Sequence, residues 1–293
     1  IGNSFALMRG GGDLATGIAY RLWRSGLPVL VLELKRPLPV RRRVAVATAI
    51  HENQITIEDL HAQRANSVDE AMQLIQRGII PVMVAPELSV IGDRLSVSGD
   101  RLAVNNQQLT INNQQSTIPI LIDARMAKRN IDTRIDQADL VIALGPGFTA
   151  GIDCHAVIET MRGHRLGRVI WEGAALPNTG TPGTVAGKGA ERVLRAPVDG
   201  VVNWRLEIGD FVQQGDVVGD VNGDSVFAPF AGVIRGLIAP GMRVRQGLKI
   251  GDVDARGDRD ACFTISDKAL AIGGGVLEAI LTHLNRTQIN SGS

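Results

Sequence analysis

The chain has 293 residues, a length that favours two domains because single hydrophobic cores stop growing near ~250–300 residues. Its 31 Lys and Arg against 30 Asp and Glu give a net charge of +1, which supplies no basic surface for binding nucleic acid or a membrane. No apolar run reaches the ~18 residues of a membrane-spanning helix, and the first residues lack the pattern of a secretion signal. Two cysteines make neither a disulfide framework nor a metal-binding set, so the sequence predicts a cytoplasmic location and no metal site.

The chain opens with a predicted strand, a glycine turn, a helix and a second strand. The first strand covers Ser4–Arg9, and the second, Val29–Leu34, is an aliphatic run typical of a buried parallel strand. The helix between them places four apolar residues on one face: Ala15, Ile18, Ala19 and Leu22. Gly26 is predicted to end this helix.

The glycine turn carries the strongest local motif. Gly10, Gly12 and Ala15 fit the pattern G-x-G-x-x-A at the end of a strand and the start of a helix. Glycines there let a pyrophosphate approach the backbone amides at the positive end of the helix dipole. Glu33, 21 residues after Gly12, stands where an acidic side chain binds a ribose hydroxyl. The turn therefore predicts a dinucleotide-type ligand, and a tight turn without any ligand is the alternative.

Later segments continue the alternation of strands and helices. They are predicted as helices at Val68–Arg77 and His155–Met161 and as strands at Ile79–Val84, Ile118–Asp123, Asp139–Gly145 and Arg168–Trp171. This order predicts a Rossmann-like, doubly wound and mainly parallel sheet over residues 1–188. Residues 92–119 contain rough seven-residue repeats rich in Asn and Gln, which favour a surface insertion and leave short hairpin strands as the alternative.

Two further loops follow predicted strands and are expected to meet the glycine turn, because ligands of open α/β sheets bind beyond the carboxyl ends of the strands. The complete set of predicted ligand-binding residues is Gly10, Gly11, Gly12, Asp13, Leu14, Ala15, Glu33, Asp123, Arg125, Gly145, Pro146, Gly147 and Phe148. For Asp123 and Arg125, a buried structural ion pair is the alternative.

Three side chains are weaker candidates for chemistry. His155 or Lys128 could donate a proton if the protein is an oxidoreductase, although a histidine at a helix start often bonds only to backbone. Cys154 has no base assured beside it, so it is not a strong candidate nucleophile.

The C-terminal third contains an internal repeat. Residues 196–221 and 228–253 match at an offset of 32 positions, which indicates two copies of one β-rich unit. The pair resembles a barrel-sandwich hybrid, the fold of biotinyl and lipoyl carrier domains, over residues 194–256. The joint, Asn222-Gly223, is a hairpin signal, and no lysine lies between Lys188 and Lys249, so neither biotin nor lipoate is expected.

A helical segment is expected at residues 264–285. It contains Gly273-Gly274-Gly275, and each glycine costs about 1 kcal/mol relative to alanine inside a helix. We therefore expect the helix either to break there or to pack very closely against another backbone.

Several stretches together resemble the accessory-protein family of selenium-dependent molybdenum hydroxylases (the YqeB type), which is related to maturation factors of xanthine and carbon monoxide dehydrogenases. They are GGGDLATGIAYRLWRSG, DARMAKRNIDTRIDQADLVIALGPGFTAGIDCHAVIETMRGHRLGRVI, RAPVDGVV, GLKIGDVDAR and ISDKALAIGGGVLEAIL. The resemblance implies a cytoplasmic helper in the maturation of a molybdenum hydroxylase, which handles the molybdenum cofactor, possibly as its dinucleotide. The residues leave two alternatives open, an NAD-dependent oxidoreductase and a non-catalytic scaffold that docks a partner enzyme.

Overall fold

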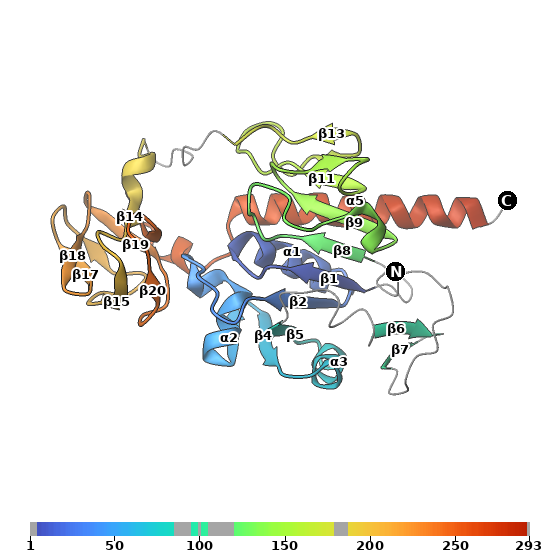
Figure 1. Cartoon of the computed structure of the whole chain (residues 1–293), viewed down its shortest axis with the longest axis horizontal. Helices are drawn as coiled ribbons and strands as arrows, with labels where there is room; N and C mark the ends of the chain where they lie inside the picture. The colour runs from blue at the N-terminus through green and yellow to red at the C-terminus, as the bar shows by residue number, and fades with distance from the viewer. Residues whose placement is uncertain (1–4, 85–94, 99–100, 105–119, 179–186, 292–293) are drawn as a thin grey trace. The chain divides into compact units, whose positions relative to one another are not determined.

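A computed structural model describes residues 5–84, 95–98, 101–104, 120–178 and 187–291, which fall into two compact units (Figure 1). The first unit contains Ile1–Pro37, Val46–Asn178 and Ser266–Ser293, and the second contains Leu38–Ala45 and Thr179–Ile265. The short segment 38–45 therefore belongs with the C-terminal β-rich part of the chain, whereas the last helix belongs with the first unit.

The first unit is built on a nine-stranded sheet in the order β12-β11-β9-β8-β1-β2-β5-β4-β3. Its strands are β1 (Ala6–Arg9), β2 (Val29–Glu33), β3 (Gln54–Ile57), β4 (Leu60–Ala65), β5 (Ile80–Val84), β8 (Ile120–Asp123), β9 (Leu140–Leu144), β11 (Ala156–Ile158) and β12 (Val169–Ile170). The seven inner strands are parallel, and the two edge strands, β3 and β12, are antiparallel to their neighbours.

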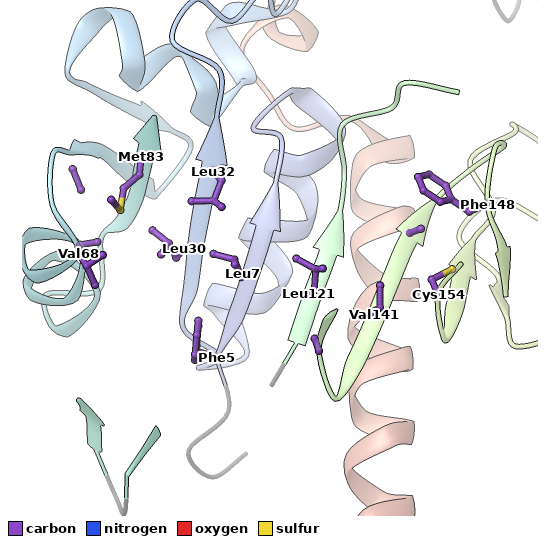
Figure 2. Close-up of a cluster of buried hydrophobic side chains, with 14 of the residues drawn as sticks. Phe5, Leu7, Leu30, Leu32, Val68, Met83, Leu121, Val141, Phe148 and Cys154 are labelled. Carbon is purple, nitrogen blue, oxygen red and sulfur yellow. The ribbon is translucent and has the colours of Figure 1, made fainter. Parts of the chain in front are cut away.

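Apolar side chains on one face of this sheet form a buried cluster (Figure 2). Leu7, Leu30, Leu121 and Val141 come from four neighbouring strands and lie side by side in it. These strands are apolar at almost every position, and successive side chains point to opposite faces of the sheet. Both faces can therefore pack against other parts of the chain. The helix α3 (Val68–Gln76) begins at Ser67, whose hydroxyl accepts a hydrogen bond from the Glu70 amide, and packs against β4 and β5.

The helices α1 (Asp13–Arg24) and α5 (Asp267–Ser291) pack together very closely. A Cβ atom added to Gly17 would overlap the backbone of Ala269, and one added to Gly273 would overlap the carbonyl of Gly17. Gly275 is likewise pressed against the carbonyl of Gly167. Of the two outcomes expected for the triple glycine, the structure shows close packing in an unbroken helix.

The remaining elements of the first unit are short. They are the helix α2 (Ala49–Glu52), the 3-10 turns Val46–Thr48 and Ile135–Gln137, the hairpin β6 (Leu95–Ser98) and β7 (Arg101–Val104), and the pair β10 (Thr149–Ala150) and β13 (Gly173–Ala174). Of the predicted insertion at residues 92–119, only this hairpin lies within the described residues.

The second unit consists of two four-stranded sheets, in the orders β14-β21-β19-β16 and β18-β17-β15-β20. Its strands are β14 (Val193–Arg195), β15 (Gly200–Trp204), β16 (Phe211–Val212), β17 (Val217–Val221), β18 (Asp224–Phe227), β19 (Gly232–Leu237), β20 (Arg243–Val244) and β21 (Lys249–Asp254), with 3-10 turns at Arg42–Val44, Ala190–Arg192 and Asp260–Cys262. Each repeat copy gives its short middle strand to the other copy, since β16 pairs with β19 and β20 pairs with β15.

The expected fold class is wrong. We expected a Rossmann-like doubly wound sheet joined to a biotinyl/lipoyl-like barrel-sandwich hybrid and a terminal helix, whereas the described residues form a mixed α/β structure with several separate sheets. No helix connects β9 to β11, and residues 155–161, predicted as a helix, contain β11 instead. Pairing with β9 determines the conformation there, and the sequence of that segment alone does not reveal this pairing.

In the described part of the chain, no helix has the length and apolar character needed to cross a membrane.

Candidate functional site

The parallel strands of the first unit end at one edge, which we call the carboxyl edge: the ends of β1, β2, β8, β9 and β11 and the loops that follow them. The glycine turn begins this edge. The Gly11 amide donates a hydrogen bond of 2.7 Å to Glu33 Oε2, and the Leu34 amide donates one of 2.7 Å to Oε1. The Ala47 amide donates to the Gly11 carbonyl at 2.8 Å. The turn is thus bonded to the protein's own groups.

Two of the three glycines are required by close packing within the chain. A Cβ atom on Gly10 would lie 3.0 Å from the backbone of Ala124, and one on Gly11 would lie 3.0 Å from the Ala47 nitrogen. Gly10 also has a φ of 95°, which disfavours other residues. Gly12 differs, because an added Cβ would meet nothing within 4 Å. Gly12, Asp13 and Leu14 are half-buried, whereas Ala15 is fully buried in the helix.

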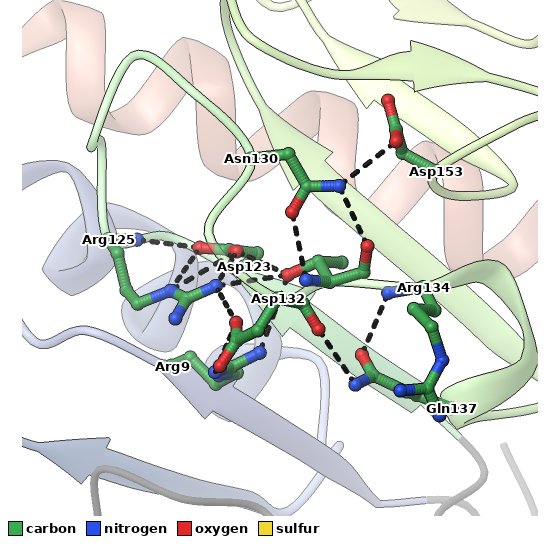
Figure 3. A network of polar contacts seen from close by, with 9 residues as sticks. Arg9, Asp123, Arg125, Asn130, Asp132, Arg134, Gln137 and Asp153 are labelled. Atoms are coloured by element: carbon green, nitrogen blue, oxygen red, sulfur yellow. Dashed lines mark hydrogen bonds and ion pairs between the residues drawn. The ribbon is translucent and has the colours of Figure 1, made fainter.

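Asp123 and Arg125 lie in a polar network at the end of β8 (Figure 3). The Arg125 guanidinium contacts Asp123 at 2.5 Å and Asp132 at 2.7 Å, and the Thr133 hydroxyl donates to Asp123 at 2.6 Å. Arg9, which is 3% exposed, adds a 2.6 Å ion pair with Asp132. Burial works against the charge of Asp123, but the bonds from Arg125 and Thr133 hold its pKa below the ordinary value.

This network engages the polar atoms of Asp123 and Arg125 with each other and with neighbours. In the sequence analysis, a buried structural ion pair was the alternative to ligand binding by Asp123 and Arg125, and this network has the arrangement of such a pair. Their contact with a ligand stays a prediction, as it does for the glycine turn.

The loop Gly145–Phe148 also packs against its own chain. Gly145 has a φ of 68° and faces the Thr160 side chain, and a Cβ on Gly147 would lie 2.6 Å from the Arg129 backbone. Pro146 is half-buried between them, and Phe148, 4% exposed, belongs to the apolar cluster of the sheet (Figure 2).

Of the three candidates for proton transfer or nucleophilic attack, Lys128 lies at the carboxyl edge, whereas His155 and Cys154 do not. His155 precedes β11, at the opposite end of the sheet, where its Nδ1 accepts a 2.9 Å bond from the Val141 amide. Burial and the nearby His283 lower the pKa of His155. Burial raises the pKa of Cys154 to about 12. Lys128 is exposed in the loop after β8, with a φ of 60°.

The sequence did not reveal a cavity of about 490 Å³ beside β11 and β12. Its polar lining is Glu159, Arg165 and Arg168, and its apolar lining includes Val169, Ile170, Leu176 and Pro177. We call it the arginine cavity. Glu159 falls in a segment predicted as a helix and Arg168 in one predicted as a strand, and no spacing of residue types distinguishes these arginines from other surface arginines.

Glu159 is a fixed part of the arginine cavity. It is 1% exposed, and its carboxylate accepts bonds from the Met161 amide at 2.7 Å and the Leu176 amide at 2.9 Å. Within the described residues, neither the Arg165 nor the Arg168 guanidinium has a hydrogen-bond or ion-pair partner. The cavity therefore combines one satisfied carboxylate with two cations that are available to an anion.

The charge of Glu159 also acts on a half-buried lysine. Lys268 is in the first turn of α5, where the charges of Asp13, Glu159, Arg162 and Asp267 all act on it. Burial is the largest effect and lowers the pKa of Lys268. No group of three or more His, Cys, Asp or Glu side chains suited to a metal ion occurs among the residues that the structure describes.

Comparison with known proteins begins with a curated relative. The chain is 43% identical over 280 residues to the protein named "Uncharacterized protein YqeB" of Escherichia coli (strain K12). This supports the resemblance to YqeB-type proteins. The match covers 96% of this chain and 48% of the relative, so the chain spans about half the length of that relative. No family model matches the chain.

Three solved structures carry related names. They are an aspartoacylase family protein from Mesorhizobium loti (15% identical, 86% of this chain and 85% of that chain, TM-score 0.27), a succinylglutamate desuccinylase from Silicibacter sp. TM1040 (11%, 86% and 85%, TM-score 0.24) and a succinylglutamate desuccinylase/aspartoacylase from Rhodobacter sphaeroides (23%, 22% of each chain, TM-score 0.20). Scores this low assign neither a fold nor an activity to the chain.

The expected function is wrong. It required a molybdenum-hydroxylase maturation factor with a pyrophosphate ligand on a Rossmann domain, whereas the first unit does not have the expected Rossmann-like fold. The glycine turn that motivated it is bonded to Glu33 and Ala47. The oxidoreductase and scaffold alternatives and a role for the molybdenum cofactor gain no support.

Proposed function

We propose that the first unit binds a small organic anion, carrying a carboxylate or phosphate group, in the arginine cavity. The observation that carries this proposal is the pair Arg165 and Arg168, whose guanidinium groups line a cavity of about 490 Å³ without partners among the described residues. Cavities of roughly 300–1,000 Å³ suit small ligands.

The chemistry of the lining narrows the class of ligand. A guanidinium presents a planar fork of donors that matches a carboxylate or phosphate. The apolar side, with Val169, Ile170 and Leu176, suits a short carbon skeleton. Glu159 opposes a second negative charge nearby, although two backbone amides already bond its carboxylate. A monoanionic head with a carbon tail fits this distribution of charge best.

Calorimetric titration with phosphate, succinate and pyruvate tests the proposal. Replacing both arginines (Arg165→Gln with Arg168→Gln) is expected to weaken binding of the best of these anions at least tenfold, since a charge-assisted hydrogen bond contributes about 1.5–3 kcal/mol. The matched control is Arg77→Gln, because Arg77 is exposed just after α3 and does not line the cavity.

Binding that is equal in the wild type, the double variant and the control would contradict the proposal, as would no binding of any of the three anions. The expected molybdenum-cofactor or NAD ligand, the hydroxylase partner and the cytoplasmic location stay predictions, and the proposed function depends on none of them.

A further inference from the structure

Charged side chains of the second unit come together across three neighbouring strands. Asp252 lies on β21, opposite Val193 of β14 on one side and opposite Gly236 of β19 on the other. Arg192 ends the 3-10 turn just before β14, and Arg235 directly precedes Gly236 on β19. The register of the sheet therefore places Asp252 between these two arginines.

Arg235 is deeply buried but only weakly paired. Its side chain is 9% exposed, and its Nη1 lies 3.4 Å from Asp254 Oδ2. Arg256 makes the stronger bonds to that carboxylate, with Nε 3.0 Å from Oδ1 and Nη2 2.6 Å from Oδ2. The ladder shifts register between Ile234 and Gly236, which makes Arg235 the extra residue of a bulge, and bulges redirect side chains.

The two arginines and Asp252 each keep one buried polar atom without a hydrogen-bond partner among the described residues. These atoms are Arg192 Nε, Arg235 Nε and Asp252 Oδ1. Arg192 Nη1 is bonded to the other oxygen of Asp252 at 2.6 Å, and Lys249 Nζ lies 3.5 Å from Oδ1 as an ion pair. Because an unsatisfied buried polar atom costs free energy, three of them in one place indicate a missing partner.

The chemistry of the three atoms defines that partner. The two Nε–H groups need an acceptor, whereas the Asp252 oxygen needs a donor. At neutral pH, hydrogen phosphate offers both, since its charged oxygens accept and its hydroxyl donates, and guanidinium groups match phosphate well. Burial and the charge of Arg41 lower the pKa of Arg235, so an added anion would stabilise its charged form.

We propose that Arg192, Arg235 and Asp252 form a phosphate site in the second unit. The two arginines bind the charged oxygens, and Asp252 accepts a hydrogen bond from the phosphate hydroxyl. The ligand is inorganic phosphate or the phosphate group of a monoester. This inference goes beyond the proposed function, because it concerns the other unit and another set of residues. An ordered water molecule is the competing occupant.

Calorimetric titration of the full chain with inorganic phosphate, glycerol 3-phosphate and sulfate tests the site. The parent protein carries Arg165→Gln and Arg168→Gln, so that the arginine cavity does not contribute. We expect phosphate to bind at least tenfold more tightly than sulfate, because sulfate has no hydroxyl to donate to Asp252. Glycerol 3-phosphate that binds as tightly as phosphate indicates a monoester ligand, and weaker binding indicates inorganic phosphate.

Variants added to this parent assign the binding to the three residues. Arg235→Met removes the buried guanidinium and is expected to weaken phosphate binding at least tenfold. The matched control is Arg243→Met, because Arg243 is exposed on β20 in the other sheet. Phosphate should raise the thermal unfolding midpoint of the parent and of the control, but not that of Arg235→Met. Arg192→Gln repeats the test from the 3-10 turn if Arg235→Met does not fold.

Replacing the carboxylate tests its role separately. Asp252→Asn is expected to bring the affinities for phosphate and sulfate within about threefold of each other, because an amide can donate a hydrogen bond to sulfate. A role in folding alone would not change this preference between the two anions.

Three results would overturn the inference. They are equal binding of phosphate and sulfate by the parent, phosphate binding that both arginine variants of the second unit leave unchanged, and no phosphate binding at all. The last of these would leave an ordered water as the occupant. Because the parent lacks the arginines of the cavity, each of these results leaves the proposed function standing.

Discussion

At the scale of single residues, Cys154 shows how burial determines the chemistry available to a side chain. Its thiol is fully buried, and burial together with the nearby charge of Asp153 raises its pKa to about 12. The thiolate is the reactive form, so at pH 8 only a very small fraction of Cys154 is reactive. The pKa of the buried Cys262 is also raised, again mainly by burial.

We therefore expect iodoacetamide at pH 8 to leave both cysteines unmodified in the native protein and to modify both in concentrated urea, as followed by intact-mass spectrometry. The unfolded sample is the control for reagent activity. Rapid native labelling of Cys154 would show that its surroundings are not as closed as the structure indicates.

The candidate site also shows why residue patterns in the sequence did not identify the binding residues. Gly10, Gly12, Ala15 and Glu33 satisfy a nucleotide-binding pattern, yet Glu33 and the Ala47 amide bond to the turn. A glycine pattern indicates that some group lies very close to the backbone. It does not show whether that group belongs to a ligand or to the protein itself. The sequence did not single out Arg165 and Arg168, because two exposed arginines form no recognisable pattern until the cavity beside β11 and β12 is known.

At the scale of elements, the packing of α1 against α5 gives two neighbouring glycines opposite roles. A Cβ on Gly273 would overlap the Gly17 carbonyl, whereas one on Gly274 would meet nothing within 4 Å. We expect Gly273→Ala to lower the free energy of unfolding by about 1–3 kcal/mol through overpacking. Gly274→Ala should raise it by up to about 1 kcal/mol, because alanine favours the helix.

Urea denaturation of the two variants and the wild type measures both effects. Each variant adds the same methyl group to the same helix, so Gly274→Ala controls for helix propensity. Equal effects of the two substitutions would mean that the close approach of α1 and α5 does not hold in solution.

The strands also differ in how well the sequence predicted them. The strands β1, β2, β5, β8 and β9 were predicted because continuous apolar runs between turn residues identify buried parallel strands. The strand β11 was not, since its three residues carry no pattern of their own and become a strand by pairing with β9. The edge strand β3 and its neighbour β4 were missed because polar residues interrupt their apolar runs.

At the scale of the whole molecule, ion networks in both units link stability to pH. In the folded state, hydrogen bonds and ion pairs hold the pKa values of Asp123, Asp132 and Asp254 below the ordinary value, although burial opposes this. Their contribution is complete above the unfolded pKa of about 3.9 and is lost as the pH falls through the lowered folded values. The lowered pKa of His155 adds an earlier loss below pH ~6.5, because the unfolded chain binds that proton more readily.

We therefore expect the urea midpoint to be constant near pH 7, to fall slightly below pH ~6.5 and to fall steeply below pH ~4. Asp123→Asn should lower stability at pH 7 by about 3 kcal/mol, since it leaves Arg125 short of a buried partner, and should make the acid loss shallower. An acid slope that Asp123→Asn leaves unchanged would show that this carboxylate does not contribute.

Domain organisation was predictable only in part, for a reason that also lies at this scale. The 32-residue repeat identified the β-rich region, but the arginines of segment 38–45 gave no sign of their partners there. Arg42 bonds to Glu207, 165 positions along the chain, and to the Leu237 carbonyl. Contacts between residues so far apart in the sequence form only in the folded chain, so no local sequence pattern predicts them.

The return of α5 to the first unit has a consequence for biosynthesis. Ribosomes release the amino-terminal part first, so the glycine-bearing face of α1 emerges long before its partner exists; Arg21 bonds to Leu270, 249 positions later. The face of α1 that packs against α5 therefore stays exposed on the nascent chain while the whole repeat region is translated. A stalled or prematurely terminated polypeptide would expose that face permanently, which makes it a natural target for chaperones and quality-control proteases.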